Sequence, residues 1–312
     1  MRVTGQTLLR NSLRHIQNHF QTLSRNQEML ASGIRVAKPS DDPIAAQRIL
    51  RWRKVEDGIS QYQRNIDNAK IWMNTTESVI SSVNGIVETI HELALQGGNS
   101  LVPDEVRSGF TNEVEALLKQ VVSLANTAVD NNSLFAGHIT DTKPFTVTTG
   151  AGGLITAVTY NGDGGQRNIE ISEGNSFTVN SLGSNENDLT YNGVFRDNNL
   201  NIDVFQTLID LRDDLAAGNV SNINDLRLPE IEEMMENLAV AQSTIGLKLN
   251  AITLSGDILS KELIDVQEEI ANNEQSDYAK VVSDISYEQT LYQAALTSTG
   301  NLIQGSLFDF LR

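Results

Sequence analysis

The sequence predicts a mainly α-helical protein in which N- and C-terminal segments form a long antiparallel helical bundle or coiled coil, with a small β-rich insertion domain at its tip. Three observations support this fold class. Apolar residues recur at helical spacing near both ends, and the same spacing continues over long inner stretches. The middle of the chain is instead rich in Gly, Thr, Val and Ile. With 312 residues, the chain is long enough to bury a sizeable core.

The two ends of the chain carry similar apolar rows, in residues 9–34 and 278–303. In both rows the positions alternate between steps of four and three residues, and they are apolar except for Gln27 in the first row and Gln289 and Thr299 in the second. A helix with so narrow an apolar stripe needs a partner helix to cover it. We therefore predict an assembly seam formed by Leu9, Leu13, Ile16, Phe20, Leu23, Leu30, Tyr278, Val282, Ile285, Tyr292, Leu296 and Ile303.

The two end segments also carry opposite charge. Residues 1–40 contain six Arg or Lys and one acidic residue, whereas residues 261–312 contain three basic and nine acidic residues. Opposite charge favours packing the two segments together and disfavours pairing either segment with its own copy. The alternative is a solvated charged face on each helix.

A break in each half of the chain separates the end helices from longer inner ones. Glycine readily adopts the left-handed backbone conformation that ends a helix. An aspartate followed by proline is typical of a helix start, with the aspartate as cap and the proline at the first helical position. The predicted helix joint at 35–42 is therefore marked by Gly33, Pro39, Asp41, Asp42 and Pro43. Near the other end the apolar row slips by one residue between Ile270 and Tyr278, and the polar segment 272–277 is the predicted counterpart.

Long apolar rows predict the inner helices. A row from Trp52 to Ala94 predicts a helix over residues 43–95, which Gly97 and Gly98 end. A second helix is predicted from about Pro103, burying residues from Phe110 to Ala128. Helices resume near residue 202, and a further row from Ile231 to Ile270 follows Pro229.

Residues 136–200 predict short strands in place of helices. They contain ten of the 22 glycines. Leu154–Tyr160 and Gln166–Ser172 are expected to form a hairpin around the turn at 161–165, with further strands at Phe145–Thr149 and Phe177–Asn180. The expected domains are residues 1–40 plus 272–312 as terminal arms, 41–135 plus 200–271 as a helical bundle, and 136–199 as the β insertion.

The composition excludes several classes of function. The net charge of −17 argues against general nucleic-acid binding, and no apolar run is long enough to span a membrane. The N-terminal segment lacks the apolar core of a cleaved secretory signal. There is no cysteine, so neither a disulfide nor a thiolate site is available.

No constellation of residues predicts catalysis, a cofactor or a metal. His15 and His19 share a helix face, but no third ligand lies near them in the sequence. Asp41 and Asp42 are better explained as helix-capping residues than as an acid–base pair, and the turn at 161–165 has a single carboxylate. A basic stretch indicates either an acidic partner surface or a solvated helix flank; it consists of Arg48, Arg51, Arg53, Lys54 and Arg64.

Motifs near both ends resemble the flagellin superfamily. The first is Leu30–Val36 followed by Pro39–Ala46, and the second is Tyr292–Leu296 with the ending Ser306–Leu311. The resemblance covers about residues 1–135 and 200–312. Four segments are more similar to the hook-associated branch at the hook–filament junction than to filament flagellin: Met1–Thr4, Pro39–Pro43, Thr142–Phe145 and Asp309–Leu311.

The resemblance implies a structural component of the bacterial flagellum, an adaptor that joins hook and filament by self-assembly through its terminal helices. It implies no catalysis and no cofactor. The implied partners are further copies of the chain in a ring, the first hook-associated protein, flagellin and a flagellar export chaperone. The implied location is extracellular, reached by the flagellar type III route without a cleaved signal peptide.

Two alternatives remain at this point. One is a flagellin-type filament subunit. The other is a surface-binding module, with residues 136–200 recognising a glycan or a host protein, although aromatic residues there are sparse. Under the adaptor hypothesis, we expect a polar substitution at Ile285 or Leu296 to abolish assembly while sparing the core of the monomer.

Overall fold

The structure, a computed structural model, describes residues 5–186 and 189–310. Four long or medium helices and two terminal helices form most of the chain: α1 (Gly5–Ser32), α2 (Pro43–Gly97), α3 (Asp104–Ala125), α4 (Val204–Ala217), α6 (Leu228–Glu274) and α7 (Tyr278–Phe310). A short helix, α5 (Val220–Asn222), and a π-helical turn at Ile223–Arg227 lead into α6. The predicted mainly helical fold is confirmed.

Nine short strands lie between α3 and α4 in the described part of the chain. They are β1 (Ala128–Val129), β2 (Asn132–Ser133), β3 (Phe145–Thr149), β4 (Ile155–Tyr160), β5 (Asn168–Ser172), β6 (Asn175–Thr178), β7 (Leu182–Ser184), β8 (Gly193–Asp197) and β9 (Ile202–Asp203). A 3₁₀ turn at Ala151–Gly153 connects β3 and β4. The strands form three two-stranded sheets and one three-stranded sheet of order β7-β8-β9.

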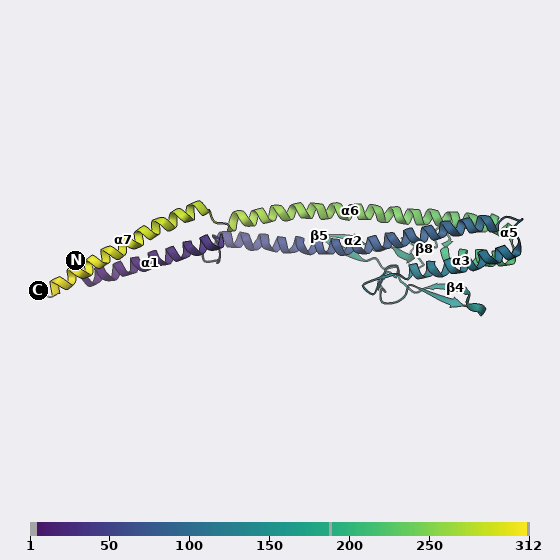
Figure 1. The fold of residues 1–312 in the computed structure, drawn as a ribbon, viewed down its shortest axis with the longest axis horizontal. Coiled ribbons are helices and arrows are strands. Elements are labelled where there is room, and N and C mark those ends of the chain that lie inside the picture. The colour runs from purple at the N-terminus through teal and green to yellow at the C-terminus, as the bar shows by residue number, and fades with distance from the viewer. Residues whose placement is uncertain (1–4, 187–188, 311–312) are drawn as a thin grey trace. The chain divides into compact units, whose positions relative to one another are not determined.

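The chain divides into two compact units. The first takes in the chain up to Gly58 and from Glu262 onward, and the second takes in Ile59–Lys261. In the first unit α1 and α7 lie side by side and antiparallel (Figure 1). In the same unit, the start of α2 contacts the end of α6 through a hydrogen bond of 3.0 Å between Gln267 and Glu56.

The second unit is a helical bundle that carries the strands. Its part of α2 lies along α6, as shown by hydrogen bonds from Gln63 to Ser260 (3.3 Å) and from Gln242 to Glu77 (2.9 Å). Every position of the apolar rows predicted for α2 and α6 is buried or half-buried, including Ile66, Ile80 and Ile252. The helices pack by these rows because each row returns to the same face every seven residues.

An aromatic cluster joins the strands to α4. The rings of Phe145, Phe195 and Phe205 are fully buried, with centroids 4.8–5.8 Å apart. Phe135 packs edge-on against Phe195 at 5.0 Å. The β region therefore shares a core with the bundle and is anchored to it by large apolar surfaces.

The strand pairing differs from the predicted hairpin. β4 pairs with β3, and β5 pairs with β6, both antiparallel, so the turn at 161–165 connects two separate sheets. Residues 161–165 do not close a hairpin because their hydrogen bonds go largely to the segment 136–144. Asn161 N donates to Pro144 O, and the Asp163 carboxylate accepts from His138 N as well as from Gly165 N. Ala128, expected on the buried face of a helix, is exposed and lies in β1.

Candidate functional site

The predicted apolar row on each helix contains two sets of positions that each recur every seven residues, and the α1·α7 hairpin covers one set, here called the inner row. Leu9, Ile16, Leu23 and Leu30 are half-buried along α1. On α7, Ile285 is buried and Tyr292 is half-buried. These residues recur every seven positions and face the partner helix. The side chain of Ile303 lies outside the described part of the structure.

The other predicted row of each helix is exposed. Leu13 and Phe20 are 49% and 57% exposed, and Val282 and Leu296 are 49% and 44% exposed. Gln27 and Gln289 occupy the same row and are exposed as well. The residues one position before each member of the row are less exposed, and most of them are polar or small: Ser12, His19, Asn26, Val281, Glu288 and Ala295. The apolar stripe of each helix is thus wider than the partner helix covers.

The two exposed rows lie on the same side of the hairpin. Each row follows the covered positions by one residue, which is a rotation of about 100° around the helix. Because α1 and α7 are antiparallel, the same rotation on both helices brings the two rows to one face. A ring contact between Phe20 and Tyr292, with centroids 6.1 Å apart, links the helices next to this face. The result is a row of exposed apolar side chains, interrupted by the exposed Gln27 and Gln289 and here called the outer row: Leu13, Phe20, Val282 and Leu296.

A polar pair fixes the register of the hairpin. His19 Nδ1 lies 2.8 Å from the Glu288 carboxylate, and both side chains are partly buried. The pair joins residues 269 positions apart in the sequence. Sequence reasoning missed it, although its signal is present: polar residues recur every seven positions at 12, 19 and 26, beside the apolar row.

The two helix breaks lie against each other and form one joint. Gly33 ends α1 with a φ of +72°, and Tyr278, predicted as part of the seam, has its hydroxyl against the glycine. Ile34 pairs with Gln275 in an isolated antiparallel bridge, with Arg35 N donating to Glu274 O at 2.7 Å and Ser276 N to Gly33 O at 3.0 Å. The chain therefore crosses from the inner helices to the end helices at two adjacent points.

Charged side chains hold the N-terminal part of the joint. Asp42 caps α2 by accepting from Ala45 N at 3.0 Å, directly before Pro43 at the first helical position. Arg35 donates to the Asp42 carboxylate at 3.1 Å and to Asn273 O at 2.9 Å, so it connects the two breaks. The backbone hydrogen bond from Ala45 and the bond from Arg35 hold the pKa of Asp42 below its ordinary value.

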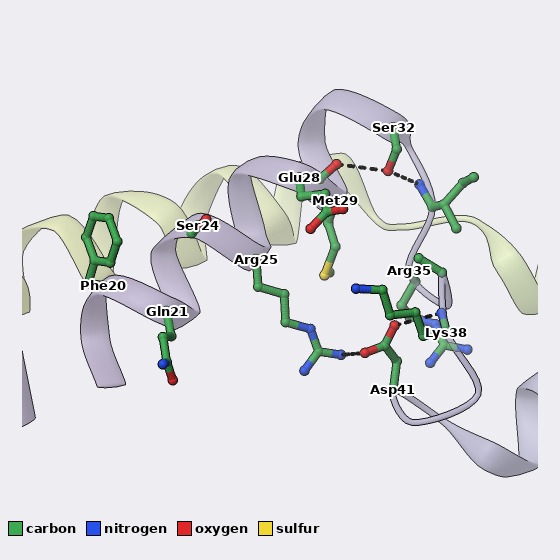
Figure 2. Close-up of a pocket in the computed structure, with 12 residues that line it drawn as sticks. Phe20, Gln21, Ser24, Arg25, Glu28, Met29, Ser32, Arg35, Lys38 and Asp41 are labelled. Carbon is green, nitrogen blue, oxygen red and sulfur yellow. Dashed lines mark hydrogen bonds and ion pairs between the residues drawn. The ribbon is translucent and has the colours of Figure 1, made fainter. Parts of the chain in front are cut away.

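Asp41 connects the joint to α1. One carboxylate oxygen lies 3.2 Å from Arg25, and the other accepts from Lys38 N at 3.0 Å (Figure 2). Beside them is a pocket of about 400 Å³, with Phe20 at one end and Lys38 and Asp41 at the other. Pro39, in the same loop, is exposed. The sequence analysis did not predict that Arg25 and Arg35 lie here. For Arg35 the available signal was its closeness in the sequence to Asp41 and Asp42, whereas Arg25, on the preceding helix, gave no such signal.

The other residues singled out in the sequence do not form a site. His15 is exposed, and within the described residues no three His, Asp or Glu side chains are placed to hold a metal ion. The basic stretch on α2 lies largely exposed, and Arg53 pairs with Glu274 at 2.6 Å. Across residues 5–186 and 189–310, no helix is long and apolar enough to cross a membrane.

The chain is similar to flagellar proteins. Residues 5–140 match the bacterial flagellin N-terminal helical region. The chain is 24% identical over 322 residues to flagellar hook-associated protein 3 of Salmonella typhimurium, with all of both chains covered. It is 20% identical over 318 residues to a flagellin of Bacillus subtilis, again over all of both chains. These relatives are structural flagellar proteins and not enzymes.

Solved structures share the fold. A Vibrio parahaemolyticus protein described as a putative flagellar hook-associated protein matches with a TM-score of 0.65 and 23% identity, over 75% of this chain and all of that chain. Flagellar hook-associated protein 3 of Legionella pneumophila matches with a TM-score of 0.60 and 16% identity, over 72% of this chain and 98% of that chain.

Proposed function

We propose that this chain, which carries the flagellin N-terminal helical region and is homologous along its full length to flagellar hook-associated protein 3, is a structural adaptor of the bacterial flagellum. In this role it joins the hook to the filament by assembling with other flagellar proteins through its terminal helices. It performs no reaction, so its function is carried by the surfaces that it presents to neighbouring subunits.

The outer row on the α1·α7 hairpin is the observation that supports this proposal. Its residues recur at heptad spacing on both helices and lie on one face of the hairpin. An apolar face of this kind fits the helices of a neighbouring subunit, because heptad spacing is matched by another helix. We infer that the inner row packs α1 against α7 within one chain and that the outer row packs against the helices of a neighbouring subunit.

The finer assignments follow from the same proposal. The neighbours would be further copies of the chain in a ring, the first hook-associated protein on one side and flagellin on the other. A flagellar export chaperone would cover the outer row before assembly. The chain would leave the cell through the flagellar type III route, without a cleaved signal peptide, and act outside the cell.

Substitution in the outer row tests the proposal. Leu296→Asp places a charge on the outer row, whereas Ser298→Asp places the same charge two residues away, at an exposed position of the same helix outside the outer row. A buried leucine contributes about 2–4 kcal/mol, and every copy in a ring carries the loss. We expect cells that carry only Leu296→Asp to lose attached filaments and motility, while Ser298→Asp cells keep both.

Circular dichroism of the purified variants provides the control, since both should retain the helix content of the native chain. Filaments attached at normal number in the Leu296→Asp strain would contradict the proposal.

A filament subunit is the second candidate function, favoured by the full-length similarity to flagellin of Bacillus subtilis. A filament subunit added to seeds continues to add and gives long filaments, whereas an adaptor stops after a short layer. Growth of long filaments from purified protein on seeds would favour the flagellin role.

A further inference from the structure

A second pocket lies in the second unit, and none of its lining residues belongs to α1 or α7. Its volume is about 420 Å³, within the range of roughly 300–1,000 Å³ that small-molecule sites occupy. Segments around β6, β7 and β8 form one wall and α6 forms the other. The described lining residues are Gln166, Thr178, Asn180, Ser181, Leu182, Thr190, Tyr191, Asn192, Gly193, Val194, Asn237, Val240, Ala241, Thr244 and Lys248.

The chemistry of this lining is selective. Eight of the 15 lining residues carry an amide or an aliphatic hydroxyl group, five are apolar or glycine, and the other two are Tyr191 and Lys248; none of the described lining residues is Asp or Glu. Amide groups both donate and accept hydrogen bonds, as hydroxyl groups do. Such a lining complements a small molecule that carries several hydroxyl groups.

Lys248 adds a preference for negative charge. Its side chain is half-buried on α6, and burial lowers its pKa from the ordinary value. The ammonium donates to Asn180 O at 3.4 Å, a long hydrogen bond for a group with three donors. An anion in the pocket would supply a stronger, charge-assisted partner for the remaining donors.

Buried amides hold the walls of the pocket in place. The Asn180 side chain accepts from Arg167 N and donates to Gly165 O, both at 2.9 Å. On the other wall, Asn237 donates to Gly193 O at 3.1 Å and to Val194 O at 3.2 Å. Both asparagines are 4% exposed. A pocket whose walls are fixed in advance loses less conformational entropy when it binds a ligand.

We propose that this pocket binds a hexuronic acid, a pyranose sugar that carries a carboxylate. The carboxylate pairs with the Lys248 ammonium, the sugar hydroxyls bond lining side chains other than the two wall asparagines, such as Gln166 and Asn192, and Tyr191 lines the pocket as an apolar ring surface. This inference goes beyond the adaptor role and does not depend on it, because every group involved belongs to the second unit.

Calorimetric titration of the purified full-length chain tests the proposal. The probes are D-glucuronate, D-glucose, which has the ring without the carboxylate, and acetate, which has the carboxylate without the ring. The variant is Lys248→Gln, and the matched control is Lys261→Gln, an exposed lysine on the same helix outside the pocket. Circular dichroism checks that both variants fold.

We expect D-glucuronate to bind more tightly than glucose or acetate. Because a hydrogen bond to a charged group contributes about 1.5–3 kcal/mol, Lys248→Gln should weaken glucuronate binding about tenfold or more, while Lys261→Gln leaves it unchanged. Equal binding of acetate and glucuronate, equal binding of glucose and glucuronate, or unaltered glucuronate binding to a folded Lys248→Gln variant would each overturn the proposal. So would the absence of saturable glucuronate binding. Because the titration uses unassembled protein, its outcome is separate from that of the motility test.

Discussion

Gly33 sets the path of the chain at the joint, because its φ of +72° is a conformation that side-chain-bearing residues rarely adopt. Its N–H donates to Met29 O at 2.9 Å, which closes the end of α1. The glycine also allows Tyr278 to approach, since a Cβ at this position would lie 2.7 Å from the tyrosine hydroxyl. A single residue thus determines both the turn and the contact between the two breaks.

Gly33→Ala should therefore loosen the joint. The left-handed conformation costs a residue with a Cβ about 1–2 kcal/mol, and the contact with Tyr278 adds to that cost. We expect proteinase K to cut within residues 33–42 faster than in the native chain, as measured by mass spectrometry of the fragments. Gly58→Ala is the control, because a Cβ there meets no atom within 4 Å and the residue lies inside α2. Equal cutting rates in Gly33→Ala and the native chain would disprove this role.

A buried ion pair stabilises the second unit at the residue scale. Arg212 on α4 lies 2.7 Å from Glu115 on α3, with side chains only 4% and 7% exposed. Glu115 also accepts from Ile155 N, and Arg212 donates to Ile155 O, so the pair holds both helices to β4. Burial raises the pKa of Glu115, but the hydrogen bonds from Arg212 and Ile155 and the nearby Lys119 lower it more, so the pKa lies below its ordinary value.

Glu115→Gln should destabilise the chain in a pH-dependent way. A carboxyl group whose pKa falls on folding contributes stability above its unfolded pKa, and this is lost as the pH falls through the folded pKa. Breaking a buried pair costs about 3 kcal/mol, so urea unfolding at pH 7 should show a loss of about this size. The difference from the native chain should shrink below the ordinary carboxyl pKa of 4.5.

The exposed Glu113 on the same helix provides the control, and Glu113→Gln should change the free energy of unfolding little at either pH. A loss in Glu115→Gln that is equally large at pH 3 and pH 7 would contradict the assigned role of the carboxylate.

At the scale of elements, the apolar rows on α1 and α7 have two different neighbours. From the sequence, Leu13 and Ile16 are indistinguishable, because both lie on the stripe and the period does not identify its partners. The structure separates them, because Ile16 faces α7 and Leu13 does not. Only the pairing of two distant segments, fixed by contacts such as His19 with Glu288, decides which half of the stripe is covered within the chain.

This division predicts opposite behaviour for two substitutions expected from the sequence to act alike. Ile285→Asp places a charge in the inner row, where the side chain is 9% exposed, whereas Leu296→Asp places it in the outer row. Hydrogen exchange measured by mass spectrometry should show loss of protection in α1 for Ile285→Asp and native protection for Leu296→Asp. Equal protection of α1 in the two variants would mean that the rows are not separate surfaces.

The strands show where sequence reasoning at the element scale fails. Phe145–Thr149 and the strands on either side of residues 161–165 are recognisable from their composition, and the structure has strands there. Their pairing is decided by contacts distant in the sequence, such as those of Asp163 with His138 N and of Phe145 with Phe205. Local turn signals carry no information about such contacts, so the predicted hairpin was wrong.

At the scale of the whole molecule, both ends of the chain meet in one unit while residues 59–261 form the other. Similar apolar rows at the two ends and the breaks at Gly33 and residues 272–277 are visible in the sequence, and the three domains inferred from them stay a prediction. The pocket beside Lys248 was not predictable, because its walls come from β-region segments and α6, far apart in the chain. Under the proposed adaptor role, the two ends together would present one assembly surface.

The location of the native protein within a purified flagellum tests the account most directly. Electron microscopy with a label attached to the chain would show where the copies lie. An adaptor assembled through the outer row predicts label confined to a narrow band between hook and filament. Label distributed along the length of the filament, or absent from the flagellum, would contradict the account.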